Sequence, residues 1–129
     1  MKTLPLVLLC CLILSACDLD LFHKGERRVA GIYELSKSEA GRYYLLRQQD
    51  AGESGTGVVD GTVMQIGWNN KFILVERQAS FGGDKDGWMI VNVSNGTIVG
   101  PFTHEELKAH SEVADIHPHP PDEAWNMLR

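Results

Sequence analysis

The sequence predicts a mainly β domain of the α+β class, an antiparallel meander or partial barrel of about six strands with one C-terminal helix packed on it. Three observations lead to this prediction. Short segments rich in β-branched and aromatic residues, separated by turn signals, fill the chain from residue 29 to residue 99. A helix signal follows only at Thr103. The length of 129 residues, 43% of them hydrophobic, fits one domain and excludes a large multidomain enzyme.

The first two predicted strands are Val29–Leu35 and Arg42–Arg47. The polar stretch between them ends at Gly41, which is typical of a hairpin. The next segment, Gln48–Gly57, has no hydrophobic period and little apolar content. It is therefore expected to be a loop.

Four further segments have the composition of strands and the connections of antiparallel neighbours. Asn69 and Asn70 tolerate left-handed backbone and suit a tight connection between two of them. Ser94, Asn95 and Gly96 form a second turn signal. The four predicted strands are Val58–Trp68, Phe72–Gln78, Trp88–Val93 and Thr97–Val99.

Helical structure is expected only near the C-terminus. Thr103 and Glu106 have the spacing of a capping box, and a helix from about His104 to Val113 would follow. Pro118, Pro120 and Pro121 break any helix in the next segment. Residues 122–128 can form one or two last turns, with Trp125 and Leu128 spaced to dock on the sheet.

The first 17 residues have the layout of a secretory signal. Lys2 precedes an apolar run of 11 residues from Leu4 to Leu14, and the small residues Ser15 and Ala16 follow. A helix needs about 20 apolar residues to span a bilayer, so a permanent transmembrane anchor is the weaker interpretation. We expect residues 1–16 to be removed as a signal peptide.

Leu14, Ser15, Ala16 and Cys17 resemble the lipobox of bacterial lipoproteins, a Leu followed by two small residues and an obligatory Cys. The resemblance implies that diacylglycerol is attached to Cys17 through a thioether, that cleavage occurs just before it, and that a fatty acid such as palmitate acylates the new amino group. The membrane would then be a partner through this lipid, and the protein would face the periplasm. Asp18 matches the residue that keeps lipoproteins of enteric bacteria in the inner membrane.

The cysteine count agrees with the lipoprotein interpretation. Cys10 and Cys11 lie inside the apolar run and would leave with it, so only Cys17 would remain. No intrachain disulfide could form in the mature chain. A thioether-linked cysteine is inert in an oxidising compartment, where a single free thiol is prone to mispairing.

The mature chain would begin with a short tether, residues 17–28, followed by a single domain, residues 29–129. His23, Lys24, Arg27 and Arg28 either touch anionic headgroups or belong to a solvated tether. The solvated tether is favoured because Asp18, Asp20 and Glu26 are interspersed with the basic residues.

A second resemblance covers about a third of the chain. The strands FILVERQ and WMIVNV, a turn, and the tripeptide GPF before a capped helix are similar to small bacterial secreted and lipid-anchored β proteins of unknown function. The resemblance supports the fold and implies no activity.

Histidines near acidic residues suggest a metal site, because imidazole and carboxylate are ligands of zinc and copper. The strongest pair is His117 and His119. The prolines around them favour a polyproline II helix, in which residues two apart point about 120° away from each other. An exposed, titratable tail is therefore favoured over a metal site. The late histidines are His104, His110, His117 and His119, with Asp115, Asp122 and Glu123 nearby.

Other candidate sites are incomplete. Asp84 and Asp86 resemble part of a calcium loop, but Lys85 lies between them and the remaining ligands are missing. Gly52, Gly55 and Gly57 are followed by strand-like sequence rather than by the helix that a phosphate loop needs. No nucleophile motif is readable. With 17 acidic and 12 basic residues the chain also lacks the basic stripe of a nucleic-acid binder.

Aromatic residues offer the strongest binding material. One residue of the pair Tyr43 and Tyr44 should be buried and the other exposed, because consecutive strand residues face opposite ways. Trp68, Trp88 and Trp125 are each expected to pack in the core.

The sequence thus favours a lipid-anchored lipoprotein that is not an enzyme, needs no cofactor, and binds an unknown protein partner at the periplasmic face of a membrane. One specific version is an immunity lipoprotein that neutralises a membrane-active toxin. The alternative is a metal-binding or metal-sensing lipoprotein that uses His117 and His119. The residues that would bind a partner cannot be read from the sequence.

Overall fold

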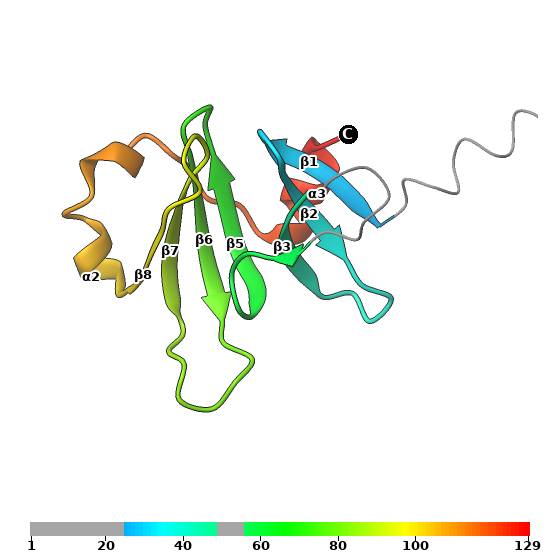
Figure 1. Cartoon of the computed structure of the whole chain (residues 1–129), viewed down its shortest axis with the longest axis horizontal. Coiled ribbons are helices and arrows are strands. Elements are labelled where there is room, and N and C mark those ends of the chain that lie inside the picture. Colours follow the sequence, from blue (N-terminus) through cyan, green and yellow to red (C-terminus); the bar gives the residue numbers. More distant parts are fainter. Residues whose placement is uncertain (1–24, 49–55) are drawn as a thin grey trace, which may run out of the picture.

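The computed structural model describes residues 25–48 and 56–129, and their strands form two antiparallel sheets. Figure 1 shows the sheets side by side, with α3 against the first sheet and α2 beyond the second. The first sheet has the order β1 (Glu26–Ala30), β2 (Tyr33–Lys37), β3 (Tyr43–Arg47) and the two-residue β4 (Thr56–Gly57). The second has the order β5 (Thr62–Trp68), β6 (Phe72–Gln78), β7 (Gly87–Asn92) and β8 (Ile98–Phe102). The predicted mainly β architecture with a C-terminal helix is confirmed.

The first hairpin differs from the expectation. A single strand from Val29 to Leu35 was expected, but the chain turns at Gly31, and β1 pairs with β2. Gly31 has a φ of 57°, and a Cβ built there would lie 2.7 Å from Cγ1 of Val93. The left-handed backbone and the close neighbour both favour glycine at this turn. This turn accounts for one of the two strands found beyond the six that were predicted, and β4 is the other.

β1 also shortens the expected tether. Residues 26–28 were assigned to a tether ending at residue 28, but Glu26 pairs with Ser36 and Arg27 with Leu35 in the first sheet. Both residues belong to β1, which begins at Glu26, one residue after the start of the described chain. The remaining tether, including Lys24 and His23, lies outside the described residues.

The two predicted turns of the second sheet are confirmed, but one of them forms for a different reason. Asn69 does not use left-handed backbone, since no described residue other than glycine has a positive φ. Instead, its side-chain oxygen accepts hydrogen bonds from the backbone N–H of Lys71 (2.9 Å) and Phe72 (2.8 Å). At the second turn, Gly96 has a φ of 75°. Asn69 thus serves as a hydrogen-bond acceptor for the backbone of its own turn.

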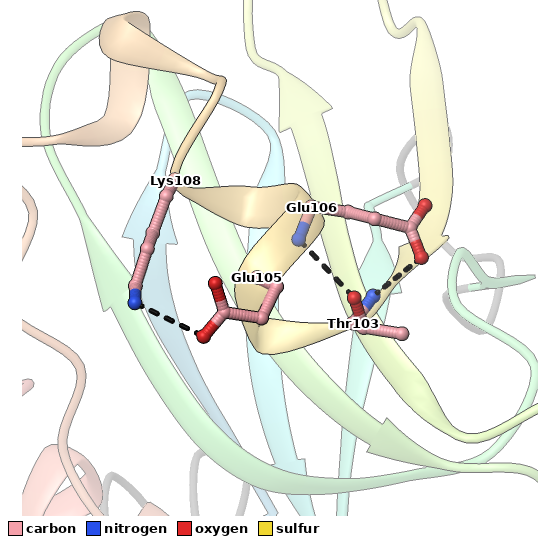
Figure 2. Close-up of polar contacts among 4 residues, drawn as sticks. All are labelled: Thr103, Glu105, Glu106 and Lys108. Carbon is pink, nitrogen blue, oxygen red and sulfur yellow. Dashed lines mark hydrogen bonds and ion pairs between the residues drawn. The ribbon is translucent and has the colours of Figure 1, made fainter.

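The predicted capping box is confirmed, but the helix it begins is short. The N–H of Glu106 donates to the Thr103 hydroxyl (3.1 Å), and the N–H of Thr103 donates to the Glu106 carboxylate (3.4 Å), as Figure 2 shows. The helix α2 (His104–Leu107) then ends, whereas a helix to about Val113 was expected. A separate 3₁₀ turn, η1 (Ser111–Val113), follows and buries Val113. The bend is needed because a straight helix has only a narrow apolar stripe to place on the sheet.

The predicted last helical turns form α3 (Pro121–Met127), which starts directly after the proline-rich segment. Pro121 occupies the first helical turn, where its missing N–H costs nothing and its fixed φ suits the helix. Ala124, Trp125 and Leu128 are buried against the sheets. The docking residues predicted from their spacing, Trp125 and Leu128, are therefore confirmed.

The main core lies between the two sheets and α3, and a smaller core lies on the opposite face of the second sheet. β6 shows the division directly, because Ile73 and Val75 belong to the main core whereas Leu74 belongs to the smaller one. A strand that is buried on both faces has a continuous run of apolar residues, which explains the sequence FILV at residues 72–75. The smaller core contains Leu74, Trp88, Ile90, Val113 and Ile116.

The burial of the aromatic residues largely follows the expectation. Tyr43 is 7% exposed and packs in the main core, whereas Tyr44 is half-buried. Trp88 and Trp125 are buried, in different cores, and Trp68 is half-buried. Trp125 and Tyr43 meet edge to face with ring centroids 6.0 Å apart.

The segment between η1 and α3 crosses the outer edge of β5. Ile66 and His119 exchange two backbone hydrogen bonds of 2.9 and 2.8 Å. At the next residue, a Cβ built on Gly67 would lie 2.6 Å from Cγ2 of Ile116 and 2.8 Å from the carbonyl oxygen of His117. The crossing therefore requires a residue without a side chain at position 67.

We expect the substitution Gly67→Ala to lower the free energy of unfolding by about 1–3 kcal/mol, because the added methyl group overpacks the crossing. Gly82→Ala is the matched control, since a Cβ at Gly82 meets nothing within 4 Å. Urea unfolding followed by circular dichroism measures both variants. Equal stability of the two would contradict the tight crossing.

Arg27 joins β1 to the C-terminal end of α3. Its guanidinium donates hydrogen bonds to the carbonyl oxygens of Trp125 (2.6 Å) and Leu128 (3.1 Å), and its central carbon lies 4.4 Å from the centroid of the Trp125 ring. The last carbonyls of a helix have no partner within the helix, and a cation there is also favoured by the helix dipole. Arg27 is thus a structural residue rather than a headgroup contact.

Replacing Arg27 by Ala should reduce the free energy of unfolding by about 1.5–3 kcal/mol, the range for a hydrogen bond made by a charged group. The neighbouring variant Arg28→Ala is the control, because Arg28 is exposed and bonds only to the exposed Gln48 side chain among the contacts described. Denaturant titration of both variants gives the comparison. A loss of stability in Arg28→Ala as large as in Arg27→Ala would refute a specific clamp on α3.

Candidate functional site

A groove with a volume of about 770 Å³ lies between the two sheets. We call it the inter-sheet groove. One wall comes from the β2–β3 hairpin, the other from the start of β5 and the end of β6, and the start of α3 closes it. The lining residues are Lys37, Gly41, Arg42 and Tyr43, then Thr62, Val63, Met64, Gln78, Ala79 and Ser80, and finally Pro121 and Asp122.

The groove combines apolar walls with a polar rim. Tyr43 and Val63 are buried side chains of the main core, and Met64 is 46% exposed. The ammonium group of Lys37 lies 5.7 Å from the centroid of the Tyr43 ring, and Arg42 is exposed beside it. Two cations against one carboxylate make this rim basic in a protein with a net charge of −5. Such a surface can hold an extended segment that carries both apolar and acidic side chains.

The inter-sheet groove brings hydroxyl, amide and charged side chains together with apolar ones. Its described lining includes no histidine or cysteine, so Ser80 has no imidazole beside it to act as a general base. That the protein is not an enzyme stays a prediction from the sequence.

The β6–β7 loop adjoins the groove at Ala79 and Ser80, and it gives a structural role to Asp86, one of the two aspartates that resemble part of a calcium loop. The carboxylate of Asp86 accepts a hydrogen bond from the N–H of Ala79 (2.8 Å), and the Arg77 side chain donates to the carbonyl of Lys85 (3.1 Å). Asp86 thus closes the loop instead of facing an ion. Phe81, next to the groove residue Ser80, is 67% exposed.

The structure changes the picture of His117 and His119. We expected their side chains to point away from each other, but the two ring centroids lie 5.2 Å apart. The backbone bonds between His119 and Ile66 hold this part of the chain against β5. Nδ1 of His119 lies 3.0 Å from a carboxylate oxygen of Glu123. Within residues 25–48 and 56–129, no group of three or more histidine, cysteine or acidic side chains is placed to hold a metal ion.

The other late histidines lie apart from this pair. His104 is exposed at the start of α2. His110 stacks on Phe102, with centroids 4.3 Å apart, and its Nδ1 lies 2.9 Å from a carboxylate oxygen of Glu112. A hydrogen bond from the Glu112 backbone, and then the bond with His110, lower the pKa of the Glu112 carboxyl. The associated stabilisation is present above the ordinary pKa of a glutamate and is lost as the pH falls through the lowered value.

Sequence reasoning missed the groove because its walls come from three distant parts of the chain. Lys37 and Arg42 flank a turn, Met64 lies on a strand with a mixed pattern, and Asp122 begins a helix. No local motif links these residues. An apolar side chain exposed on a strand, as Met64 is, was the one signal available, and the mixed alternation of apolar and polar residues in this segment concealed it.

The predicted lipidation and sorting residues, Cys17 and Asp18, lie outside the described residues, as do Gly52 and Gly55. None of the helices in the described part of the chain has the length and apolar character needed to cross a membrane. Because Cys17 lies outside the described residues, its lipidation stays a prediction from the sequence.

Comparison with known proteins identifies one family. No curated protein and no solved structure matches the chain. A family model described as a protein of unknown function, DUF3997, matches residues 30–119, which is 90 of the 129 residues and runs from the end of β1 to the crossing at His119. The chain belongs to the DUF3997 family of proteins of unknown function.

Proposed function

We infer that the protein is a lipid-anchored lipoprotein of the bacterial cell envelope, and that its domain binds a protein partner in the inter-sheet groove without catalysing a reaction. The observation that carries the binding role is the groove itself, with its apolar walls and basic rim. The lipobox at Leu14 to Cys17 supports the anchor, and Asp18 favours the periplasmic face of the inner membrane if the host sorts lipoproteins as enteric bacteria do.

The anchor would hold the groove close to the bilayer. Cys17 precedes the start of β1 at Glu26 by nine residues, which reach at most about 32 Å when fully extended. Restricting a domain to this layer raises its effective concentration toward other membrane-bound proteins. The groove would therefore still be occupied by a partner that binds it with only modest affinity.

The occupant we propose is an extended segment of the partner with apolar and acidic side chains. Met64 is flexible and polarisable, and such side chains adapt to apolar partners. Lys37 and Arg42 provide cations for carboxylates, and Arg42 can bind one with two parallel hydrogen bonds. β5 is an edge strand of the second sheet, bridged to His119 at Ile66, and edge strands can accept an added strand.

A toxin could supply this segment, which would make the protein an immunity lipoprotein. The alternative function, metal binding by His117 and His119, has one observation in its favour, the 5.2 Å separation of their rings. It is less well supported because Glu123 already holds His119 and the described residues supply no third ligand for the pair.

Cys17→Ser should abolish lipidation and leave the leader of 16 residues on the chain, because the processing step requires a lipid-modified cysteine at that position. Metabolic labelling with an alkyne analogue of palmitate, followed by mass measurement of the chain, detects both effects. Cys11→Ser is the matched control and should be labelled and processed normally. An unlabelled wild-type chain would refute the anchor.

Photo-crosslinking in intact cells tests the groove. A photoreactive residue at Met64, which is 46% exposed, should give a discrete protein adduct, whereas the same residue at Val99, which is 40% exposed on the far edge of the second sheet, should not. The additional change Arg42→Glu should reduce the Met64 adduct by about tenfold, equivalent to 1.4 kcal/mol, because it reverses a rim charge. Equal adducts at both positions, or a Met64 adduct unaffected by Arg42→Glu, would count against the groove as the binding surface.

A further inference from the structure

Phe81 is the most exposed large hydrophobic side chain of the described residues, with 67% of its surface accessible. It lies in the β6–β7 loop, whose residues 80–86 are all exposed. The three residues before it, Gln78, Ala79 and Ser80, line the inter-sheet groove. Single exposed apolar residues are common on protein surfaces, so exposure alone would mean little. The way in which the loop is held gives Phe81 its significance.

The loop that carries Phe81 is closed at its base by two side chains. The Asp86 carboxylate accepts a hydrogen bond from the N–H of Ala79 (2.8 Å), which joins the two ends of the loop. Nε and Nη2 of Arg77 both donate to the carbonyl oxygen of Lys85, at 3.3 and 3.1 Å. The base of this exposed loop is therefore ordered although none of residues 80–86 is buried.

The tip of the loop is ordered as well. The N–H of Asp84 donates to the carbonyl oxygen of Phe81 (3.2 Å), which closes a four-residue turn. Gly83 has a φ of 101°, a backbone conformation that glycine adopts without strain. The backbone at Phe81 is thus fixed by the turn that it begins and by the closed base behind it.

Arg77 holds the loop in an unusual way. It is only 8% exposed, and it is the one buried charged residue of the described chain. Burial of a guanidinium costs free energy, and a buried cation is normally paired with a carboxylate. No ion pair between described residues includes Arg77, and its side-chain hydrogen bonds there go to the Lys85 carbonyl. The protein thus retains a buried charge whose described effect is to order the loop beside the groove.

An exposed aromatic ring on an ordered loop is suited to binding a protein. Aromatic side chains bury a large area and are enriched at the interface positions that contribute most to affinity. Order in the free state lowers the entropy that association costs. Figure 1 shows the β6–β7 loop projecting beyond the end of the second sheet, where a partner can reach it.

We propose that Phe81 is the aromatic anchor of the partner-binding surface. Its ring enters an apolar pocket of the partner protein while the acidic and apolar segment of the same partner occupies the inter-sheet groove. This inference rests on the proposed function of the groove and specifies its partner, which must carry a pocket for a phenyl ring next to that segment. A protein is favoured over a bilayer because the loop also exposes Asp84 and Asp86 against the single cation Lys85, and anionic headgroups repel carboxylates.

The first test measures the photo-adduct at Met64 in intact cells, with the full-length protein at an expression level that does not saturate the adduct. Phe81→Ala should lower the adduct about thirtyfold, equivalent to about 2 kcal/mol, the threshold for an interface hot spot. Phe81→Tyr keeps the ring and should stay within about twofold of the wild type. Ile98→Ala is the matched control, since Ile98 is an apolar residue 37% exposed on β8, and it should have no effect.

The second test separates the ordering of the loop from its contacts. Asp86→Ala should lower the Met64 adduct about fivefold, because a freed loop loses more entropy on binding. It should also speed hydrogen exchange of the Asp84 amide about tenfold, with the Asn69 amide of the β5–β6 turn as unchanged reference. Asp84→Ala removes the same charge from the same loop without removing the bond to Ala79, so it should leave the adduct unchanged.

The outcomes distinguish this inference from the proposed function. Absence of the Met64 adduct in the wild type would overturn both. A wild-type adduct that Phe81→Ala leaves unchanged, or that Asp84→Ala lowers as much as Asp86→Ala does, would overturn the anchor alone. A photoreactive residue at position 81 should give an adduct of the same mass as the one at Met64, and an adduct with lipid instead would also overturn the anchor.

Discussion

The structure depends on the crossing of the C-terminal segment over the edge of β5. Two backbone hydrogen bonds join Ile66 to His119, and Gly67 leaves just enough room for Ile116 and His117 to pass. On one side of the crossing the segment covers the outer face of the second sheet, and on the other side α3 enters the core between the sheets. Without this crossing both cores would lose packing partners, since each contains buried residues from the last part of the chain.

Burial of the second sheet on both faces explains why the described part of this small domain has hollows on both faces of that sheet. Alternating residues of β6 and β7 face the inter-sheet core and the outer core, so each face needs its own cover. The inter-sheet face is covered by another sheet, and two twisted sheets diverge toward their ends. The outer face is covered only by the four residues of α2 and the three of η1. Each incomplete cover leaves a concave surface. The surface between the sheets has polar and apolar walls, and the surface on the outer face has an apolar floor.

Local signals in the sequence predicted much of the fold but neither hollow. The strand Phe72–Gln78 and the capping box of Thr103 and Glu106 were predicted correctly because alternation, β-branching and cap spacing are properties of neighbouring residues. The turn at Gly31 was missed because the requirement for glycine comes partly from Val93, more than sixty residues away. The end of α2 at Leu107 was missed for a similar reason, since the shape of the outer face decides where the helix must bend. Both hollows are products of such long-range contacts.

The point at which the proposed anchor would join the domain lies beside the first sheet. The described chain begins at β1, and Arg27 ties this strand to the end of α3, so the N-terminal attachment and the C-terminus lie together beside the first sheet (Figure 1). In the proposed lipid-anchored state, tension from the lipid on Cys17 would reach the domain at β1, whose strand pairing and Arg27 clamp pass it to α3 and the main core. The hydrogen bonds of α2, which covers the far face of the second sheet, are not part of that path.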